Sequence, residues 1–441
     1  MPTQRTKANR SAEGPNIKDP ELIRALPKTD LHVHLDGSLR LETLIDLAKQ
    51  ARVRLPSDTP GGLRETVFKD RYRNLPDYLK GFRYTVAVLQ SEEALEQAAH
   101  ELAVDNQEEG VRYLEVRYAP QLHAGPHLDI RNVILAVDRG LAKATKAFNS
   151  RDAVRKGDEP PFGYGTILCA LRFFTEDFSP TYASFFRAHT HAPQPKVFAL
   201  ASLELARVAT HLTREEGIPI VGFDLAGREK GYPAADHREA YQLAHEHFLG
   251  KTVHAGEDYG PESIFQAITE CHADRIGHGT FLFDASKIRD RSIVDREKYI
   301  ESLTRYIGDR RITLEVCLTS NLQTIPEMEY DLKNHPFKLM RKARLSTTLC
   351  TDNRLVSHTT VTDEVLKAVR AFQLTPRELK DLMLYGFKRS FFAGSYKEKR
   401  AYVRQIIDYY DRIAGRFMRS QRREAQVKGS SKKRPVRKKT R

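Results

Sequence analysis

Residues 30–37 read Asp30-Leu31-His32-Val33-His34-Leu35-Asp36-Gly37, and this alternation of polar and apolar side chains is typical of a β-strand. The three apolar side chains fall on one face of the strand, and the histidines and aspartates fall on the other. Two imidazoles two residues apart on one face can bind a single metal ion. The apolar face suits a strand that helices cover. The stretch therefore predicts a strand that lies between helices and a metal-binding cavity.

Seven further stretches have the pattern of strands, and helical sequence follows each of them. They cover residues 111–120, 165–174, 218–225, 251–255, 275–278, 312–318 and 345–351. Eight strand–helix units predict an α/β fold, a parallel (β/α)8 barrel of the TIM type. An open doubly wound sheet is the alternative. It has less support, because no G-x-G-x-x-G follows the first strand and no G-x-x-x-x-G-K-[ST] occurs.

Two helical regions fall outside this regular alternation. Residues 52–82 hold several prolines and glycines among short amphipathic pieces, which predicts an insertion over the barrel mouth after the first strand. Residues 362–417 predict additional C-terminal helices with breaks near Thr375 and Gly394. We expect a flexible arm over residues 1–20, one barrel domain over 21–418 and a basic, disordered tail over 419–441.

Charge and composition exclude several classes of protein. The chain has 441 residues, 40% of them hydrophobic, and a net charge of +14, of which residues 416–441 contribute +11 through twelve Lys or Arg and one acid. We interpret that tail as a solvated extension, with contact to nucleic acid as the alternative. Four cysteines without a C-x-x-C pair indicate a reducing compartment. With no apolar signal segment or membrane span in the sequence, we expect a cytoplasmic protein.

Titratable side chains gather where the predicted strands end, which is where a (β/α)8 barrel places its reacting groups. The titratable residues at these ends are His32, His34, Asp36, Asp224, His254, Glu257, His278 and Asp352, and Gly227 and Asn353 lie beside them. Three histidines and one aspartate from strands one, five and eight form a set that suits Zn²⁺ with one open position, although Co²⁺ or Fe²⁺ could also bind. The alternative interpretation makes His278 a core histidine, Asp352 a helix cap and Glu257 a loop acid.

Five motifs, in order, resemble the adenosine deaminase family of the amidohydrolase-type barrels. They are Leu31-His32-Val33-His34-Leu35-Asp36-Gly37-Ser38, Asp224-Leu225-Ala226-Gly227, Val253-His254-Ala255-Gly256-Glu257, Arg275-Ile276-Gly277-His278-Gly279 and Thr351-Asp352-Asn353. The resemblance covers roughly residues 26–360. It implies zinc-dependent hydrolysis of adenosine and 2′-deoxyadenosine to inosine or deoxyinosine and ammonia, as in purine salvage.

The resemblance also implies a role for each matching residue. The metal would be held by His32, His34, His254 and Asp352. Glu257 would exchange a proton with purine N1, and His278 would orient and stabilise the attacking water. Asp36 would hydrogen-bond the sugar, and the backbone at Gly227 would contact the purine. These roles suit the chemistry, because attack at C6 breaks the aromatic system and N1 must gain a proton as charge builds.

Asn353 departs from the family pattern, in which a second Asp usually contacts purine N7. An asparagine amide can donate to an unprotonated N7, so we expect purine binding to survive. The change leaves open which 6-aminopurine is preferred: a nucleoside, adenine or an N6-substituted AMP. Basic residues near the mouth could bind a 5′-phosphate, but Asp36 should repel one, which favours nucleosides. A catalytically inactive barrel that only binds a partner is the remaining alternative.

Overall fold

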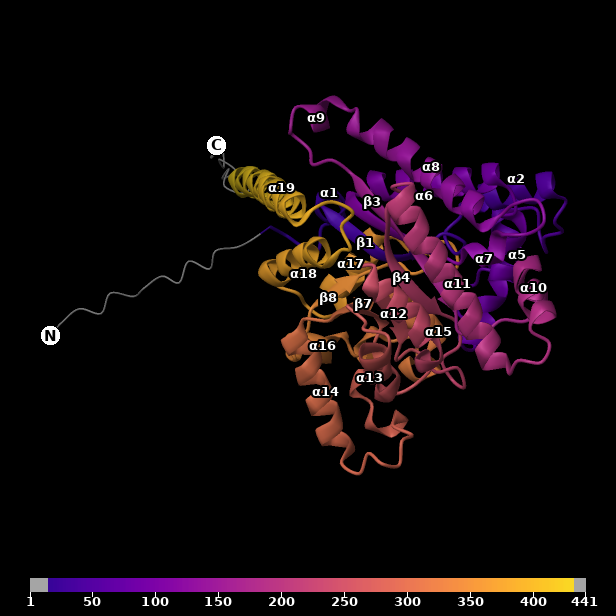
Figure 1. The fold of residues 1–441 in the computed structure, drawn as a ribbon. Coiled ribbons are helices and arrows are strands. Elements are labelled where there is room, and N and C mark those ends of the chain that lie inside the picture. The colour runs from indigo at the N-terminus through magenta and orange to yellow at the C-terminus, as the bar shows by residue number, and fades with distance from the viewer. Residues whose placement is uncertain (1–14, 432–441) are drawn as a thin grey trace, which may run out of the picture.

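The computed structural model describes residues 15–431, in which eight strands follow one another around a single sheet in sequence order (Figure 1). All seven pairings between neighbouring strands are parallel. A parallel bridge between Val33 and Asp352 brings the last strand against the first. The strands are β1 (Lys28–His34), β2 (Val111–Tyr118), β3 (Gly163–Leu171), β4 (Ile220–Ala226), β5 (Gly250–Ala255), β6 (Arg275–His278), β7 (Thr313–Val316) and β8 (Thr347–Leu349). The predicted (β/α)8 barrel is therefore confirmed.

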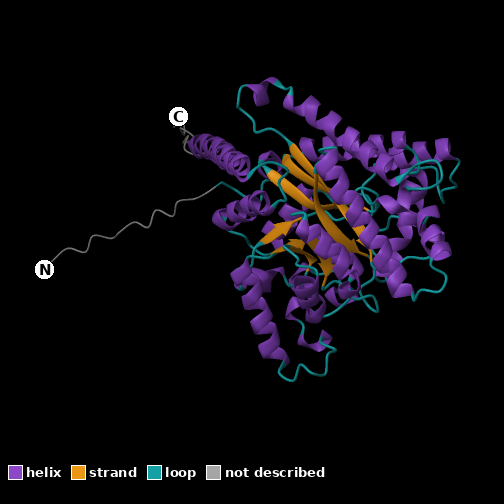
Figure 2. Cartoon of the chain, in the orientation of Figure 1, coloured by secondary structure: helices purple, strands orange, loops and turns teal. Residues whose placement is uncertain are grey.

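Helices surround the strands on the outside of the barrel (Figure 2). The α-helices are α1 (Pro20–Ala25), α2 (Leu41–Ala51), α3 (Pro60–Thr66), α4 (Leu75–Tyr78), α5 (Phe82–Val88), α6 (Glu92–Glu108), α7 (Pro120–His123), α8 (Ile130–Asn149), α9 (Asp152–Arg155), α10 (Pro180–Ala188), α11 (Gln194–Glu215), α12 (Arg238–Glu246), α13 (Pro261–Glu270), α14 (Arg296–Arg310), α15 (Leu318–Thr324), α16 (Phe337–Lys342), α17 (Val361–Ala371), α18 (Pro376–Arg389) and α19 (Tyr396–Ser431). Short 3₁₀-helices are η1 (Leu79–Gly81), η2 (Glu176–Phe178), η3 (Ala234–His237), η4 (Thr280–Phe283), η5 (Ala285–Lys287), η6 (Pro326–Met328) and η7 (Leu332–Asn334).

Local sequence explains where several helices begin. The hydroxyl of Ser91 accepts the N–H of Ala94 at the start of α6, as the sequence predicts for an N-cap. Thr375 and Glu378 form a reciprocal capping box at the start of α18. The breaks predicted near Thr375 and Gly394 are confirmed as the gaps between α17, α18 and α19.

The first strand is less regular than its alternating sequence predicts. Its register against β2 shifts between Asp30 and Val33, so Leu31 and His32 of β1 face the single residue Glu115 of β2. His32 and His34 nevertheless both reach the same cluster of side chains. The irregular step therefore leaves the predicted metal-binding face intact.

Three short helices that the periodicity does not show lie close to the barrel mouth. These are α7, α10 and α15, each placed in a stretch between a strand and its main helix. The seventh strand is also shorter than predicted, because the chain turns into α15 directly after Cys317. Segments of one or two helical turns carry too little periodicity to be recognised in a single sequence.

The insertion after β1 covers the mouth of the barrel as predicted. Residues of α4, η1 and α5 line the main cavity together with residues from the strand ends. At the C-terminus, α19 continues to Ser431, past residue 418, and the backbone N–H of Asn16 donates to Gln421. Residues 1–14 of the predicted arm and 432–441 of the predicted tail lie outside the described residues. The domain boundaries stay predictions.

All four cysteines are buried and unpaired. Within residues 15–431, no helix combines the length and the apolar character that crossing a membrane requires.

Candidate metal and substrate site

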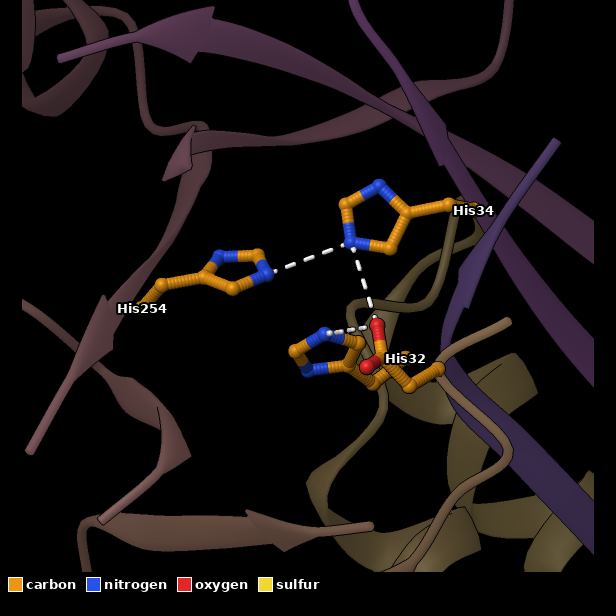
Figure 3. A group of neighbouring side chains, drawn as sticks. His32, His34 and His254 are labelled. Atoms are coloured by element: carbon orange, nitrogen blue, oxygen red, sulfur yellow. Dashed lines mark hydrogen bonds and ion pairs between the residues drawn. The ribbon is translucent and has the colours of Figure 1, made fainter. Parts of the chain in front are cut away.

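Three imidazoles face one another at the strand ends (Figure 3). His32 and His34 come from β1 and His254 from β5, and one atom of each lies with a carboxylate oxygen of Asp352 inside a group spanning no more than 4.8 Å. Asp352 Oδ1 is 3.4 Å from His32 Nε2 and 3.5 Å from His34 Nε2. His34 Nε2 lies 3.2 Å from His254 Nε2. The structure thus brings together the four ligands that the sequence predicts.

Two buried carboxylates hold the outer nitrogens of these rings. Glu315 in β7 lies 2.8 Å from His32 Nδ1, and Asp224 in β4 lies 3.1 Å from His254 Nδ1. A carboxylate beside Nδ1 keeps the proton of the neutral ring on Nδ1. Nε2 then has a free lone pair, and the ring is a better metal ligand. His32 Nε2 is buried and has no hydrogen-bond partner among the described residues. The donor set and its orientation therefore fit a metal ion.

One guanidinium joins the two carboxylates beneath the cluster. Arg117 in β2 contacts Asp224 Oδ2 and Glu315 Oε2, both at 2.9 Å, and all three side chains are fully buried. Burial raises the pKa of a carboxyl, but Arg117 and the adjoining histidine outweigh it and hold the pKa of each carboxyl well below its ordinary value. Arg275 adds a second contact, 2.7 Å from Glu315 Oε1.

The sequence does not assign roles to Arg117 or Glu315, because both fall inside the predicted strands 111–120 and 312–318. In the structure each is the last residue but one of its strand. What could have revealed them is a charged residue in a strand that is otherwise apolar enough to be buried. In the structure every position of β2 and β7 is buried. Charged side chains are almost never fully buried unless they are paired. The sequence places Asp224 at a strand end without giving it a role, and in the structure it contacts His254, a predicted metal ligand.

Asp352 does not cap a helix. It has a left-handed backbone with φ of +61°, and the N-cap of the next helix, α17, is Thr360. The hydroxyl of Ser320 donates to Asp352 Oδ2, which leaves Oδ1 turned toward the histidines. Burial opposes ionisation, but the three neighbouring histidines lower the pKa of Asp352, so it stays a carboxylate. The alternative interpretation of this residue as a cap is wrong.

Glu257 lies two residues beyond β5 and is surrounded by negative charge. Burial, followed by the charges of Asp352, Glu229 and Asp258, raises the pKa of Glu257 well above its ordinary value. Its Oε1 accepts a hydrogen bond from Thr324 at 3.3 Å, and its Oε2 is 3.6 Å from His278 Nε2. The raised pKa favours the protonated form of Glu257, which is the form that a proton donor to a substrate needs.

A chain of hydrogen bonds assigns the tautomer of His278. The backbone N–H of Phe337 donates to His335 Nδ1, so the proton of His335 is on Nε2, 3.2 Å from Asn321 Oδ1. Asn321 then turns its NH₂ group toward His278 Nδ1 at 3.0 Å. His278 Nε2 consequently carries the proton and faces Glu257. Burial, with His32 nearby, lowers the pKa of His278 well below its ordinary value, so the ring is neutral.

The cluster forms the end of a cavity of about 760 Å³. Its inner wall contains the predicted residues Asp36, Gly227, Glu257, His278 and Asn353 as well as three of the four predicted metal ligands. Its outer wall is largely apolar and is formed by Leu75, Tyr78, Leu79, Phe82, Val86, Leu122, Phe173 and Phe178. This arrangement suits a flat aromatic ligand that is recognised at one end by a few polar groups.

Two polar groups in the cavity lack partners among the described residues. Asp36 Oδ1 and Asn353 Oδ1 are buried without a hydrogen bond, and burial raises the pKa of Asp36 to about 7. Asn353 packs against Gly37, where a Cβ atom would lie only 1.8 Å from Asn353 Oδ1. Gly37 therefore allows the amide to reach the cavity. Unpaired buried polar atoms are costly, and a bound ligand can satisfy them.

Comparisons with known proteins agree with this geometry. The family model described as adenosine deaminase matches residues 27–191 and 194–409. Adenosine deaminase 1 of Streptomyces coelicolor is 33% identical over 407 residues, 92% of this chain and 92% of that protein. The adenosine deaminase of Vibrio atlanticus is 32% identical, covering 87% and 99%. The structure of Arabidopsis N6-mAMP deaminase matches with a TM-score of 0.66 and 25% identity, covering 88% and 99%.

Proposed function

Because this chain belongs to the adenosine deaminase family, we propose that it hydrolyses adenosine and 2′-deoxyadenosine to inosine and 2′-deoxyinosine, with release of ammonia and the use of one Zn²⁺. The chain is a hydrolase acting on C–N bonds, and its relatives support a 6-aminopurine deaminase. The observation that carries the proposal is the position of Glu257, a buried carboxyl with a raised pKa, in the same cavity as the His32, His34, His254 and Asp352 cluster.

The cluster suits Zn²⁺ because it offers three imidazole nitrogens and one carboxylate oxygen to a single ion. When bound, Zn²⁺ would lower the pKa of a water ligand to about 7 and so provide a nucleophile near neutral pH. His32, His34, His254 and Asp352 would hold the ion. The proton transfers and the contacts with the substrate are assigned to other residues of this chain.

Glu257 donates its proton to purine N1 as water attacks C6, which lets the ring accept the electron pair. His278, with its proton on Nε2, hydrogen-bonds the attacking oxygen and keeps it aimed at C6. The carboxylate that Glu257 has become takes one proton from the attacking water and passes it to the amino group, which leaves as ammonia. It takes the second water proton as C6 becomes a carbonyl, and the acid is restored. A buried carboxyl with a raised pKa suits these steps, because it can hold a proton for the purine and take one back afterwards.

The remaining polar groups in the cavity would fix the nucleoside. The Asn353 amide donates to N7, Asp36 hydrogen-bonds the sugar, and the backbone at Gly227, which has a φ of +95°, contacts the purine. Around the cavity, Arg83 is basic, whereas Asp36, Glu176 and Asp177 are acidic. The acidic excess supports a neutral nucleoside over a nucleotide, because a 5′-phosphate would be repelled.

A panel of possible substrates tests the proposal. Purified metal-loaded protein is incubated with adenosine, 2′-deoxyadenosine, adenine, AMP and N6-methyl-AMP, and ammonia release is measured. We expect turnover of the two nucleosides. Turnover of only AMP or N6-methyl-AMP would contradict the sugar-site argument while leaving the deaminase chemistry intact, and that outcome is the second candidate function, in line with the Arabidopsis match.

Asn353 provides a sharper test of substrate recognition. We expect Asn353→Ala to raise the KM for adenosine about 10-fold or more, because one buried hydrogen bond to the purine is lost, while metal content stays at one ion per chain. Asn353→Asp is the matched comparison, because it restores the residue usual in the family. Loss of metal from Asn353→Ala, measured by elemental analysis, would contradict the role.

A further inference from the structure

Glu229 lies in the loop after β4, with its carboxylate turned against the loop that carries Glu257. Its Oε1 accepts the backbone N–H groups of Glu257 at 2.8 Å and Asp258 at 3.2 Å. Its Oε2 accepts the N–H of Gly256 at 3.0 Å and the hydroxyl of Ser263 at 2.6 Å. Three consecutive backbone amides and one hydroxyl therefore converge on a carboxylate that is only 5% exposed.

This arrangement requires an ionised carboxylate at position 229. All four partners donate, and a carboxylate has about four lone-pair sites to receive them. Hydrogen bonds to an ionised acceptor are about twice as strong as neutral ones. A glutamine in the same place would turn an NH₂ group toward backbone N–H groups and lose at least one acceptor. The geometry thus depends on the charge of Glu229 as well as on its shape.

The hydrogen bonds that Glu229 accepts fix the backbone around Glu257. The chain leaves β5 through Gly256 with a φ of +73°, a left-handed conformation that favours glycine. The hydroxyl of Thr324 holds the far end of the Glu257 side chain. Glu257 is consequently held at its carboxyl by one neighbour and at its backbone by Glu229.

We propose that Glu229 is a positioning residue for deamination: its carboxylate holds residues 256–258 and so presents the Glu257 carboxyl to purine N1. This inference rests on the proposed function of Glu257 as the proton donor. A misplacement of about 1 Å in a reacting group can cost about 10²-fold in rate. Loss of the four bonds therefore reduces turnover without touching substrate or metal.

An electrostatic effect accompanies the geometric one. The donors around Glu229 are neutral groups, so they hold its negative charge without cancelling it. The charged and titratable groups that face Glu257 are Glu229, Asp258, Asp352 and His278. Burial first, and then the negative charges among them, raise the pKa of Glu257. Removal of the Glu229 charge lowers that pKa, so protonated Glu257 is lost at a lower pH.

The test compares Glu229→Gln with Glu239→Gln, which makes the same chemical change on an exposed side chain of α12. Ser263→Ala, which removes one of the four donors, is the milder variant if Glu229→Gln folds poorly. Each metal-loaded protein is examined by hydrogen–deuterium exchange over residues 256–258, by elemental analysis, and by kcat and KM for adenosine as functions of pH.

In Glu229→Gln we expect faster exchange over 256–258, unchanged metal content, kcat lower by about 10- to 100-fold and an alkaline decline of kcat at lower pH. Ser263→Ala should change exchange and kcat in the same directions by smaller factors, and Glu239→Gln should match the parent protein. Unchanged exchange, or a kcat loss proportional to metal loss, would overturn the inference. The hydrogen–deuterium exchange measurement does not depend on catalytic activity. Failure of the proposed function would appear separately, as a parent protein that deaminates no purine.

Discussion

Two groups of buried carboxyls lie at the same cavity and are held in opposite charge states. Asp224 and Glu315, below the metal cluster, each lie 2.9 Å from Arg117 and stay ionised. Glu257, in the cavity wall, contacts a hydroxyl and a neutral imidazole, and burial together with nearby negative charge raises its pKa and favours its protonated form. Burial raises the pKa of the carboxyls in both groups. The placement of one guanidinium therefore decides which carboxyls contact the predicted metal ligands as anions and which one is the proposed proton donor.

The largest expected effect follows from removing the protonated group. Glu257→Gln keeps the size of the side chain but cannot transfer a proton, so we expect kcat to fall by about 10²- to 10⁴-fold. In the parent protein, kcat should decline as pH rises through the raised pKa of Glu257, because the proton donor is lost. Metal content, measured by elemental analysis, should not change. A variant that keeps most of its activity would rule out this role.

The next effect concerns the tautomer of His278. Asn321→Asp replaces a donor to His278 Nδ1 by an acceptor, so we expect the proton to move to Nδ1 and Nε2 to lose it. A wrong tautomer removes the hydrogen bond to the attacking oxygen, and we expect kcat to fall about 10²-fold with KM little changed. Nitrogen NMR of the imidazole reports the tautomer directly. An unaltered tautomer with a large loss of kcat would contradict this explanation.

Arg117 should affect the metal more than the chemistry. Arg117→Met removes the guanidinium that two buried carboxylates share and leaves Glu315 with Arg275 and Asp224 with His254. We therefore expect metal affinity to fall about 10- to 100-fold and the free energy of unfolding to fall by about 3–5 kcal/mol. Competition with a chelator measures the first, and denaturant unfolding of metal-free protein measures the second.

Arg112→Met is the matched control for Arg117→Met. Arg112 lies on the same strand and pairs with Glu159, away from the cavity. This variant should lose stability but keep its metal affinity. Equal metal affinity in the two variants would mean that Arg117 does not hold the ligands through Asp224 and Glu315.

The sequence predicts the parts of the site that stand at strand ends. His32, His34 and Glu257 are recognisable because the barrel architecture specifies which end of each strand carries chemistry. Glu315 is not recognisable in this way, since a strand pattern does not reveal which interior side chains meet across a barrel. Glu229 is missed for a different reason: its partners are backbone amides about 30 positions away, and backbone groups leave no mark in a sequence.

The protonation state of Glu257 in the resting, metal-loaded protein is the most direct test of the contrast between the two groups of carboxyls. Infrared difference spectroscopy of the parent protein against Glu257→Gln isolates the carbonyl stretch of this one carboxyl. A bound dication would lower the pKa of Glu257 somewhat, so the measurement is made near neutral pH with the metal in place. The account predicts the band of a protonated carboxyl in the parent protein, converted to a carboxylate band at high pH. A carboxylate band at neutral pH would contradict it.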